Sequence, residues 1–431
     1  MIQKYDLPCG RMYYVSTKVL MITQNFYPEI GSAANRMKNI YELLNDNGFD
    51  VTVLTTEASY PNKNLYKNKM FWNDNQLNES KDIHRVTVKK RKFSLNMLSR
   101  LLFYLEFTLK MIFFVLFKKG QYDIVFVSSP PIFIGIAGIV AKYRYGAKMV
   151  LDIRDLWPES LKGVGVFNYP PILWFFSKVE KLLYKKSDAI VVNSPRFSEH
   201  IQKVANVPSE RIIYLPNAAR DFELKENIFK KEEVFKVIYT GNIGLAQDVN
   251  FLKSLAAELD KENVHLSIIG YGMKREELKQ YVNDHQLKNI SFISPTTRQD
   301  CLTLNRQHDV GILALTRKEV FDTVLPGKLI DYLTSGLPVI ASVSGFSKQL
   351  IEKYKVGYIS DGGDAKEIVE HILYLKNNAS VVKDMKANSK SLIEEHFYWE
   401  KNIVDLINLF RQFETCPSEI KSKVTKVETY E

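Results

Sequence analysis

The feature that most constrains this fold is a rhythm in which short apolar segments alternate with longer segments of helical periodicity. Such alternation predicts a parallel sheet with helices on both faces, because parallel strands are usually joined by a helical crossover. Helices are expected over residues 32–45 and 132–143. The strands expected in the first half of the chain are residues 18–23, 50–55, 83–88, 123–128 and 148–153.

The same rhythm starts again after residues 216–217. The strands expected there are residues 235–240, 265–270, 290–293, 310–315 and 339–341. A chain of 431 residues also exceeds the size at which one hydrophobic core usually stops growing. The predicted fold class is therefore α/β, with two Rossmann-like domains whose parallel sheets face a cleft.

Five segments make up the predicted domain organisation. They are an N-terminal extension (1–17), a first Rossmann-like domain (18–218), a second (219–400), a C-terminal helix that packs back on the first domain (401–416) and a disordered, charged tail (417–431). The extension lacks the apolar core of a secretory signal, so we expect no export by that route, and Met12 is an alternative start.

Charge and cysteine content say more about the cellular compartment of the protein than about its function. The formal net charge of +10 suits nucleic acid, an anionic membrane surface or a phosphorylated ligand equally well. Cys9, Cys301 and Cys416 are spaced for neither a metal site nor a disulfide framework, which predicts a reducing, cytoplasmic setting. Lys and Arg are scattered and no nucleic-acid-reading module is recognisable, so a nucleic-acid partner is not expected.

Two apolar segments break the rhythm. Residues 98–119 are strongly apolar, but Arg100, Glu106 and Lys110 interrupt them, which disfavours a bilayer-spanning helix. Two alternatives remain open, a helix lying in the membrane interface and a long core or inter-domain helix. Residues 167–186 have an aromatic front and a basic rear, a composition typical of the lipid headgroup boundary.

Candidate binding residues cluster at the carboxyl ends of the expected strands, where open α/β sheets bind ligands. Gly31 and Ser32 open a helix whose free N–H groups and dipole favour a phosphate, although a plain turn and N-cap would look the same. Asp152, Arg154 and Asp155 lie at the end of another expected strand. Such charges are difficult to explain as packing, so some of them are expected to face the cleft; the alternative is an internal ion pair of Arg154 with either aspartate.

Two further motifs lie in the second half. Asn242, Gly244 and Gln247 follow a strand in a glycine loop that lets a ligand approach the backbone, and Gly272 follows the next strand. An ordinary strand-to-helix turn would also explain that loop.

The more specific motif runs from Thr323 to Ile340. Its Pro-Gly turn at Gly327 sets a helix N-terminus with Lys328 in the first turn, where it can neutralise a diphosphate. Asp331, one turn later, can take a sugar-ring or ribose hydroxyl.

In this order the motifs resemble the retaining glycosyltransferases of family 4, which have the two-domain GT-B fold, and the similarity runs from Lys18 to about Phe413. The family's second-domain segment has two Glu; here Thr323 and Asp331 stand in their places, followed by Gly336-Leu337-Pro338-Val339. Three other family positions also differ. Asn242 and Gln247 stand where the family has an Arg and a Lys on the glycine loop, and Arg154 stands where it has a His in the first domain.

The loop, the run from Asp155 to Ser160 and the turn before Lys328 look like a subgroup that adds amino-deoxy sugars, such as N-acetylfucosamine, in bacterial capsule or O-antigen synthesis. The resemblance implies a UDP-linked nucleotide-sugar donor, held mainly by the second domain. It also implies a polyprenyl-diphosphate-linked sugar acceptor on the first domain, and a peripheral position on the inner face of the cell membrane.

For the mechanism, the resemblance implies front-face attack with retention, in which the leaving diphosphate helps to accept the acceptor's proton. The expected catalytic residues are Arg154, Asp155 and Lys328. The expected donor-binding residues are Gly31, Ser32, Asn242, Gly244, Gln247, Gly272, Thr323, Gly327, Lys328 and Asp331. No cofactor or metal is expected, because neither a His/Cys cluster nor a strand-end Asp-x-Asp pair is present.

Two other functions are weighed against this one. A nucleotide-sugar epimerase shares the architecture but needs further acid and base residues. A non-catalytic, membrane-associated scaffold of a polysaccharide assembly complex is conceivable because family side chains are replaced at Arg154, Asn242 and Thr323. A Rossmann dehydrogenase is disfavoured, since no Gly-x-Gly-x-x-Gly follows the first strand.

Overall fold

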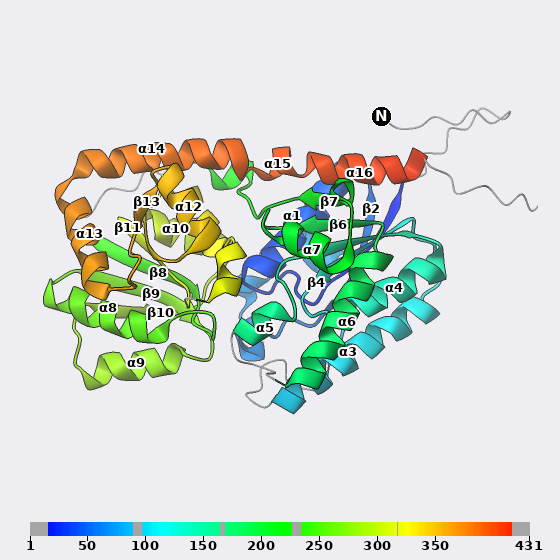
Figure 1. The fold of residues 1–431 in the computed structure, drawn as a ribbon, viewed down its shortest axis with the longest axis horizontal. Helices are drawn as coiled ribbons and strands as arrows, with labels where there is room; N and C mark the ends of the chain where they lie inside the picture. The colour runs from blue at the N-terminus through cyan, green and yellow to red at the C-terminus, as the bar shows by residue number, and fades with distance from the viewer. Residues whose placement is uncertain (1–15, 89–96, 164–168, 226–233, 317, 416–431) are drawn as a thin grey trace, which may run out of the picture.

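Two parallel sheets form the frame of the computed structural model (Figure 1), which describes residues 16–88, 97–163, 169–225, 234–316 and 318–415. The sheet of the first domain has the order β3-β2-β1-β4-β5-β6-β7 and that of the second β10-β9-β8-β11-β12-β13. The first sheet comprises β1 (Lys18–Ile22), β2 (Asp50–Thr56), β3 (Ile83–Val86), β4 (Ile124–Ser129), β5 (Lys148–Ile153), β6 (Ala189–Val192) and β7 (Ile212–Tyr214). The second comprises β8 (Lys236–Asn242), β9 (His265–Tyr271), β10 (Ile290–Ile293), β11 (Val310–Ala314), β12 (Val339–Ser342) and β13 (Gly357–Ile359).

Helices connect the strands in both domains. Those of the first domain are α1 (Ser32–Asp46), α2 (Asn75–Glu79), α3 (Met97–Phe117), α4 (Ile134–Tyr145), α5 (Glu159–Gly163), α6 (Pro170–Lys186) and α7 (Phe197–Ala205). The later helices are α8 (Val249–Lys261), α9 (Arg275–Asp284), α10 (Arg298–Arg306), α11 (Gly327–Thr334), α12 (Gly345–Lys353), α13 (Ala365–Asn377), α14 (Ala379–His396), α15 (Trp399–Asn402) and α16 (Val404–Thr415). Short 3-10 turns are η1 (Lys63–Lys67), η2 (Lys69–Phe71), η3 (Ser209–Arg211), η4 (Asp221–Glu223) and η5 (Glu319–Thr323).

Both faces of the first sheet are covered, as the strand composition predicts. Val19 and Met21 of β1 belong to one buried cluster, whereas Leu20 and Ile22 belong to another on the opposite face. Strands buried on both faces read as continuous apolar runs, which is why the sequence located them. The predicted fold class is confirmed. The short strands β6, β7 and β13 were not among the expected ones, because runs this brief give little periodic signal.

The chain crosses between the domains twice. It leaves the first domain after β7 and comes back through α14, α15 and α16, which run along one side of the molecule in Figure 1. The crossings meet where the Ala219 N–H donates to the Phe397 carbonyl at 2.8 Å and the Trp399 N–H donates to the Ala219 carbonyl at 3.0 Å. On α16, the Phe410 ring lies 5.6 Å from that of Phe49 and so packs on the first domain.

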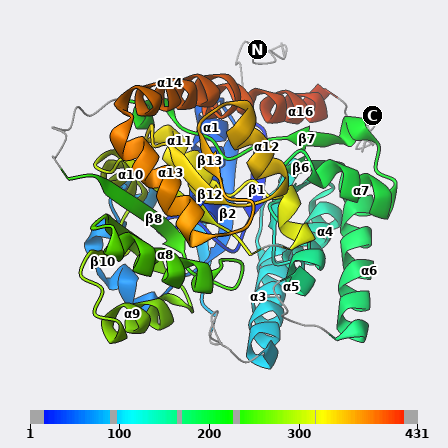
Figure 2. The same cartoon turned by 60° about the vertical axis from the view of Figure 1, so that its left-hand side comes forward.

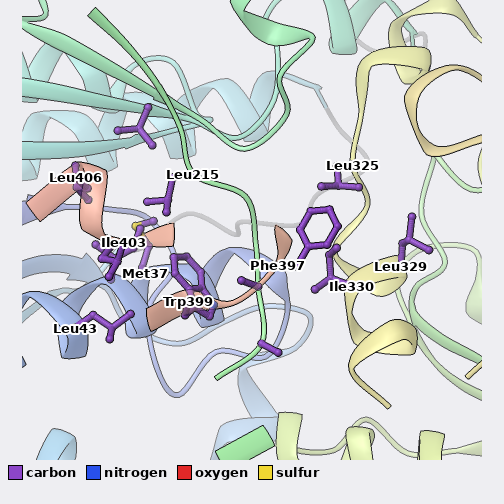
Figure 3. Packing of buried hydrophobic residues seen from close by; sticks show 14 of the residues in the cluster. Met37, Leu43, Leu215, Leu325, Leu329, Ile330, Phe397, Trp399, Ile403 and Leu406 are labelled. Atoms are coloured by element: carbon purple, nitrogen blue, oxygen red, sulfur yellow. The ribbon is translucent and has the colours of Figure 1, made fainter. Parts of the chain in front are cut away.

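An apolar cluster joins the domains beneath these crossings (Figure 3). Trp399 lies beside Met37 of α1, whereas Phe397 lies toward Leu325 and Ile330 of the second domain. All five side chains are almost fully buried. Burial of this kind holds the returning segment against both halves.

Helix α3, which covers most of residues 98–119, has two different faces, and each bears on one of the two alternatives. Phe103, Phe107, Met111 and Val115 are buried, and the helix packs beside α4. Large apolar side chains of its other face are exposed, namely Leu102, Leu105, Leu109, Phe113, Leu116 and Phe117. The helix is therefore a core helix on one side and an open apolar surface on the other.

Helix α6 projects from the same end of the first domain as α3 (Figures 1 and 2). Trp174 and Phe175 are exposed on it, as are Lys178 and Lys181. Within the described residues, every helix falls short of the length or apolar character needed to cross a membrane. The predictions for residues 1–15 and 417–431 concern segments outside the described residues.

Candidate active site

A cavity of about 920 Å³ lies between the two domains and receives the carboxyl ends of strands from both sheets. Its size suits a ligand as large as a nucleotide sugar. The predicted residues that line it are Gly31, Ser32, Arg154, Asp155, Asn242, Gln247, Gly327, Lys328 and Asp331. The predicted residues that do not line it are Gly244, Gly272 and Thr323.

Two helix N-termini meet in this cavity. Helix α1 begins at Ser32 and α11 begins at Gly327, and both residues line it. A Cβ on Gly327 would come within 2.5 Å of the Ser32 Oγ, so the close approach of the two domains needs glycine at this position. The Asn217 amide donates to the Ser32 Oγ at 3.0 Å. Free N–H groups and two positive helix ends facing each other make this region favourable for an anion.

Lys328 lies in the first turn of α11 and has an unusual environment for a cation. Its Nζ donates to the Tyr239 hydroxyl at 2.8 Å and is 4.0 Å from the centroid of that ring. Burial lowers the pKa of Lys328 to about 7, although Asp331 opposes the shift. No ion pair to Lys328 is present among the described residues, so an anion entering the cavity would stabilise its charged form.

Arg154 lines the cavity, but its guanidinium is held by groups of the first domain. Its Nε donates to the Ser128 Oγ at 2.8 Å and its Nη2 to the Pro130 carbonyl at 2.7 Å. The Asp152 carboxylate is 4.0 Å away and also accepts from Ser128. Arg154 thus belongs largely to the internal network weighed as the alternative, because two of its three guanidinium nitrogens are committed to the first domain.

A second arginine in that network is Arg36, which pairs with Asp152 and which the sequence reasoning did not single out. The Arg36 Nη2 is 2.7 Å from an oxygen of Asp152, and both side chains are fully buried. Its Nη1 also donates to the Leu215 carbonyl at 2.8 Å, and its guanidinium lies over the Trp399 ring. Asp152 therefore balances a structural arginine at the domain crossing and does not line the cavity.

Asp155 retains the character expected of a ligand-facing carboxyl group. Burial raises the pKa of Asp155 to about 6, while a hydrogen bond with Ser160 and the charge of Arg154 lower it. Trp157 lines the cavity beside it. A polar group next to an aromatic ring is an arrangement suited to a sugar, which has hydroxyls at its edge and apolar C–H groups on its faces.

The glycine loop of the second domain is shaped by its own contacts. The Gly244 N–H donates to the Gln247 Oε1 at 2.9 Å, so one end of that side chain is used within the loop. A Cβ on Gly272 would come within 2.2 Å of the Asn242 Oδ1. Gly244 and Gly272 thus leave room for the loop, whereas Asn242 and Gln247 line the cavity.

Thr323 lies at the end of η5 and is not among the residues that line the cavity. Its Oγ1 donates to the Val320 carbonyl at 3.0 Å, and its own carbonyl accepts from Ser194 of the first domain. The first contact lies within the second domain and the second contact joins the two domains, so the expectation of a donor contact from Thr323 has no support in this arrangement. The sequence aligned it with a family Glu, but its shorter side chain is consumed by the local turn.

Asp331 lines the cavity but is paired with a residue that the sequence reasoning missed. The Arg298 Nη1 is 2.5 Å from the Asp331 Oδ1. Arg298 opens α10 just after β10, so the strand-end rule used for the other candidates would also have selected it. In the described part of the chain, no group of three or more His, Cys, Asp or Glu could hold a metal ion.

Two facing parallel α/β sheets with an anion-favouring cavity between them define the class as a two-domain sugar-transfer enzyme of the GT-B type. The comparisons agree with this architecture. Residues 31–218 match the family model "Glycosyl transferase 4-like domain" and residues 221–392 match "Glycosyl transferases group 1". The chain belongs to glycosyltransferase family 4 and is a retaining glycosyltransferase that uses a nucleotide sugar. The epimerase alternative and the non-catalytic scaffold alternative are therefore both wrong.

Individual relatives are distant. A putative colanic acid biosynthesis glycosyl transferase, WcaI of Escherichia coli, is 23% identical over 78% of this chain and 86% of its own length. The sucrose-phosphate synthase of Thermosynechococcus elongatus is 14% identical with a TM-score of 0.67, covering 93% of this chain and 99% of its own. HepE of Anabaena, in a complex with UDP-glucose, is 12% identical with a TM-score of 0.65, covering 92% and 99%. These structures show the fold that the chain shares.

Proposed function

We propose that the protein transfers a sugar from a UDP-linked donor to a polyprenyl-diphosphate-linked acceptor during bacterial capsule or O-antigen synthesis. The observation that carries this proposal is the convergence of Lys328 and the N-termini of α1 and α11 in one cavity between the domains. A diphosphate matches that cluster of positive ends in charge and size. The UDP-glucose in HepE supports a uridine donor, and the printed name of WcaI supports polysaccharide synthesis.

The diphosphate serves as both leaving group and proton acceptor in the mechanism that we propose. The acceptor hydroxyl approaches on the face from which the diphosphate departs, so the anomeric configuration is retained. As the C–O bond to the diphosphate breaks, negative charge grows on the phosphate oxygens, where the ammonium of Lys328 and the amides near Gly327 stabilise it. The departing oxygen then takes the acceptor's proton.

The remaining cavity residues orient the sugar in this proposal. Asp155 takes hydroxyls of the transferred sugar, while Arg154 stiffens the strand end that carries it. An amino-deoxy sugar such as N-acetylfucosamine is our proposed donor sugar. Trp157 supports it, because an aromatic ring in the lining offers apolar contact to a deoxy methyl or an acetamido group.

Helix α3 supports a lipid-linked acceptor because it contributes to two surfaces. Tyr104 lines the cavity, and its ring is 5.7 Å from that of Trp157. Leu105 and Leu109, on the same helix, are 42% and 64% exposed. An acceptor whose lipid stays in the membrane could thus present its sugar to the cavity past the end of α3. We propose that the protein binds peripherally to the inner face of the cell membrane through this apolar face and the lysines of α6.

A panel of nucleotide sugars tests the donor. The preferred donor is expected to raise the melting temperature most, since a ligand that binds only the folded state stabilises it by mass action. The same donors are then offered with a polyprenyl-diphosphate-linked sugar, and the product is followed by mass spectrometry. Failure of every nucleotide sugar both to stabilise the protein and to react would refute the proposal.

Vesicle flotation tests the membrane partner. The protein is expected to float with vesicles that contain an anionic lipid, and the double variant Leu109→Glu and Trp174→Glu should float much less. Tyr374→Glu is the matched control, because Tyr374 is 46% exposed on α13 of the second domain. Absence of binding to both neutral and anionic vesicles would sink the membrane part of the proposal while leaving the donor part intact.

A further inference from the structure

Arg298 connects two carboxylates that lie in different parts of the second domain. Its Nη1 contacts the Asp331 Oδ1 at 2.5 Å, while its Nη2 contacts the Glu223 Oε2 at 3.2 Å and its Nε the Glu223 Oε1. Arg298, Glu223 and Asp331 all line the cavity. One guanidinium thus makes a two-point contact with one carboxylate and a single contact with the other, a geometry that only the planar fork of arginine provides.

Glu223 is itself fixed at the connection between the two domains. It ends η4, directly after the first crossing of the chain, and is almost fully buried. Its Oε2 accepts the Arg220 N–H at 3.0 Å, and its carbonyl accepts from Arg306 of α10. The carboxylate that holds Arg298 therefore has little freedom to move.

Only one oxygen of Asp331 is used by this arrangement. Its Oδ2 has no hydrogen-bond partner in the part of the chain that the structure describes. Asp331 lies one helical turn beyond Lys328 and is held by α10, deep in the second domain, whereas Gly327 faces Ser32 of the first. If the diphosphate lies at Lys328 and the transferred sugar toward the first domain, the nucleoside must lie on the side of Asp331.

We propose that Arg298 is a positioning residue for the donor: it fixes Asp331 against Glu223 so that the remaining carboxylate oxygen accepts a hydrogen bond from a ribose hydroxyl. This inference rests on the function proposed above. It names the Arg298–Asp331 contact as the one that sets the affinity of the site for the ribose of the donor. Burial raises the pKa of Asp331, and the charge of Arg298 opposes that shift. Arg298 thus also favours the ionised form, which is the stronger acceptor.

The test measures donor affinity by calorimetry in a graded series of variants, using the nucleotide sugar that the wild type turns over. Arg298→Gln is expected to weaken donor binding about 10-fold or more, with a smaller change in kcat, because a hydrogen bond to a charged group is lost. Arg298→Lys keeps the charge without the fork and should give an intermediate loss. Arg220→Gln is the matched control, since Arg220 also forms ion pairs at the crossing, with Glu42 and Glu400, but does not contact Asp331.

Donor analogues that lack the 2′ or the 3′ ribose hydroxyl separate positioning from general damage. The wild type should bind at least one analogue about 10-fold more weakly than the parent donor. Arg298→Gln should bind that analogue and the parent donor with equal affinity. The double variant Arg298→Gln and Glu223→Gln removes an unpaired buried carboxylate, so it keeps the comparison possible if the single variant folds poorly.

Three results would overturn the inference. They are unchanged donor affinity in folded Arg298→Gln, an equal loss in Arg220→Gln, and persistence of the hydroxyl preference without Arg298. All three presuppose a wild type that binds its donor. A wild type that binds no nucleotide sugar would instead overturn the proposed function, and this inference with it.

Discussion

Arg154 lines the cavity from the first domain and Lys328 from the second, and these two cations are held in opposite ways. Arg154 of the first domain is bonded to Ser128 and Pro130 and lies near the buried Asp152. Lys328 of the second domain rests on the Tyr239 ring, and its burial lowers its pKa to about 7. One charge is already satisfied by the protein, whereas the other is poorly solvated until an anion arrives. Equal formal charge at a site thus does not mean an equal part in binding.

Removal of Lys328 should have the largest effect. Lys328→Met keeps the length and apolar stem but loses the charge, so kcat/KM should fall by at least about 100-fold, as for other groups that stabilise charge in a transition state. Steady-state transfer assays at saturating and subsaturating donor measure it. Lys348→Met is the control, because Lys348 forms surface ion pairs with Glu352 and Asp361 in the same domain. Full activity in Lys328→Met would remove the basis of the comparison.

Replacement of Arg154 should cost less. Arg154→Gln is expected to lower kcat/KM about 10-fold, mainly through disorder of the strand end that carries Asp155, since structural positioning contributes less than direct charge stabilisation. Thermal unfolding of the same variant separates lost stability from lost activity. A loss larger than that of Lys328→Met would reverse the ranking of the two cations.

The low pKa of Lys328 predicts proton uptake on donor binding. Above pH 7 the free enzyme loses the Lys328 proton, and the bound diphosphate restores it, so donor affinity should fall about five-fold from pH 7 to pH 8. Calorimetry in buffers of different ionisation enthalpy measures the uptake. The groups facing Lys328 are Asp331 and Tyr239, and Arg298 acts on it through Asp331. Asp155 has a pKa of about 6 and therefore titrates below this pH range.

The pH dependence of the free energy of unfolding has the opposite sign to that of donor affinity. The pKa of Lys328 is lower in the folded protein than in the unfolded chain, so the unfolded chain holds more protons between about pH 7 and 10.5. Through this group alone, the free energy of unfolding should rise with pH across that window. Lys328→Met should abolish both the proton uptake and this contribution, and a wild type without proton uptake would contradict the assigned environment.

Chelation should have the smallest effect. Activity is expected to survive EDTA, because Lys328 and the helix N-termini would supply the positive charge that a metal ion provides in other transferases. The transfer assay is run with EDTA and again after addition of excess magnesium. If EDTA abolished activity and magnesium restored it, a metal ion would bind part of the diphosphate charge. Lys328 and the second domain would then contribute less to diphosphate binding than we propose.

The sequence was informative wherever local pattern decides position. Apolar runs located most of the strands, and the Pro-Gly turn placed Lys328 in the first turn of a helix at the cavity. Pairings between distant segments could not be predicted. Arg298 and Asp331 are separated in the chain by most of α10, by β11 and by η5. Arg36 meets Asp152 from another part of the first domain. Such pairs depend on how the layers pack, which a single sequence without internal periodicity does not encode visibly.

The return of the chain to its first domain has a consequence for synthesis on the ribosome. Phe49 and Phe126 lie deep in the first half, yet Phe410 covers both, at ring distances of 5.6 and 6.4 Å. That half emerges early but keeps an open apolar recess until nearly all of the chain has been translated. The second domain can close its own sheet in the meantime, so the half made first is the half completed last, and its exposed recess is where a chaperone would be needed.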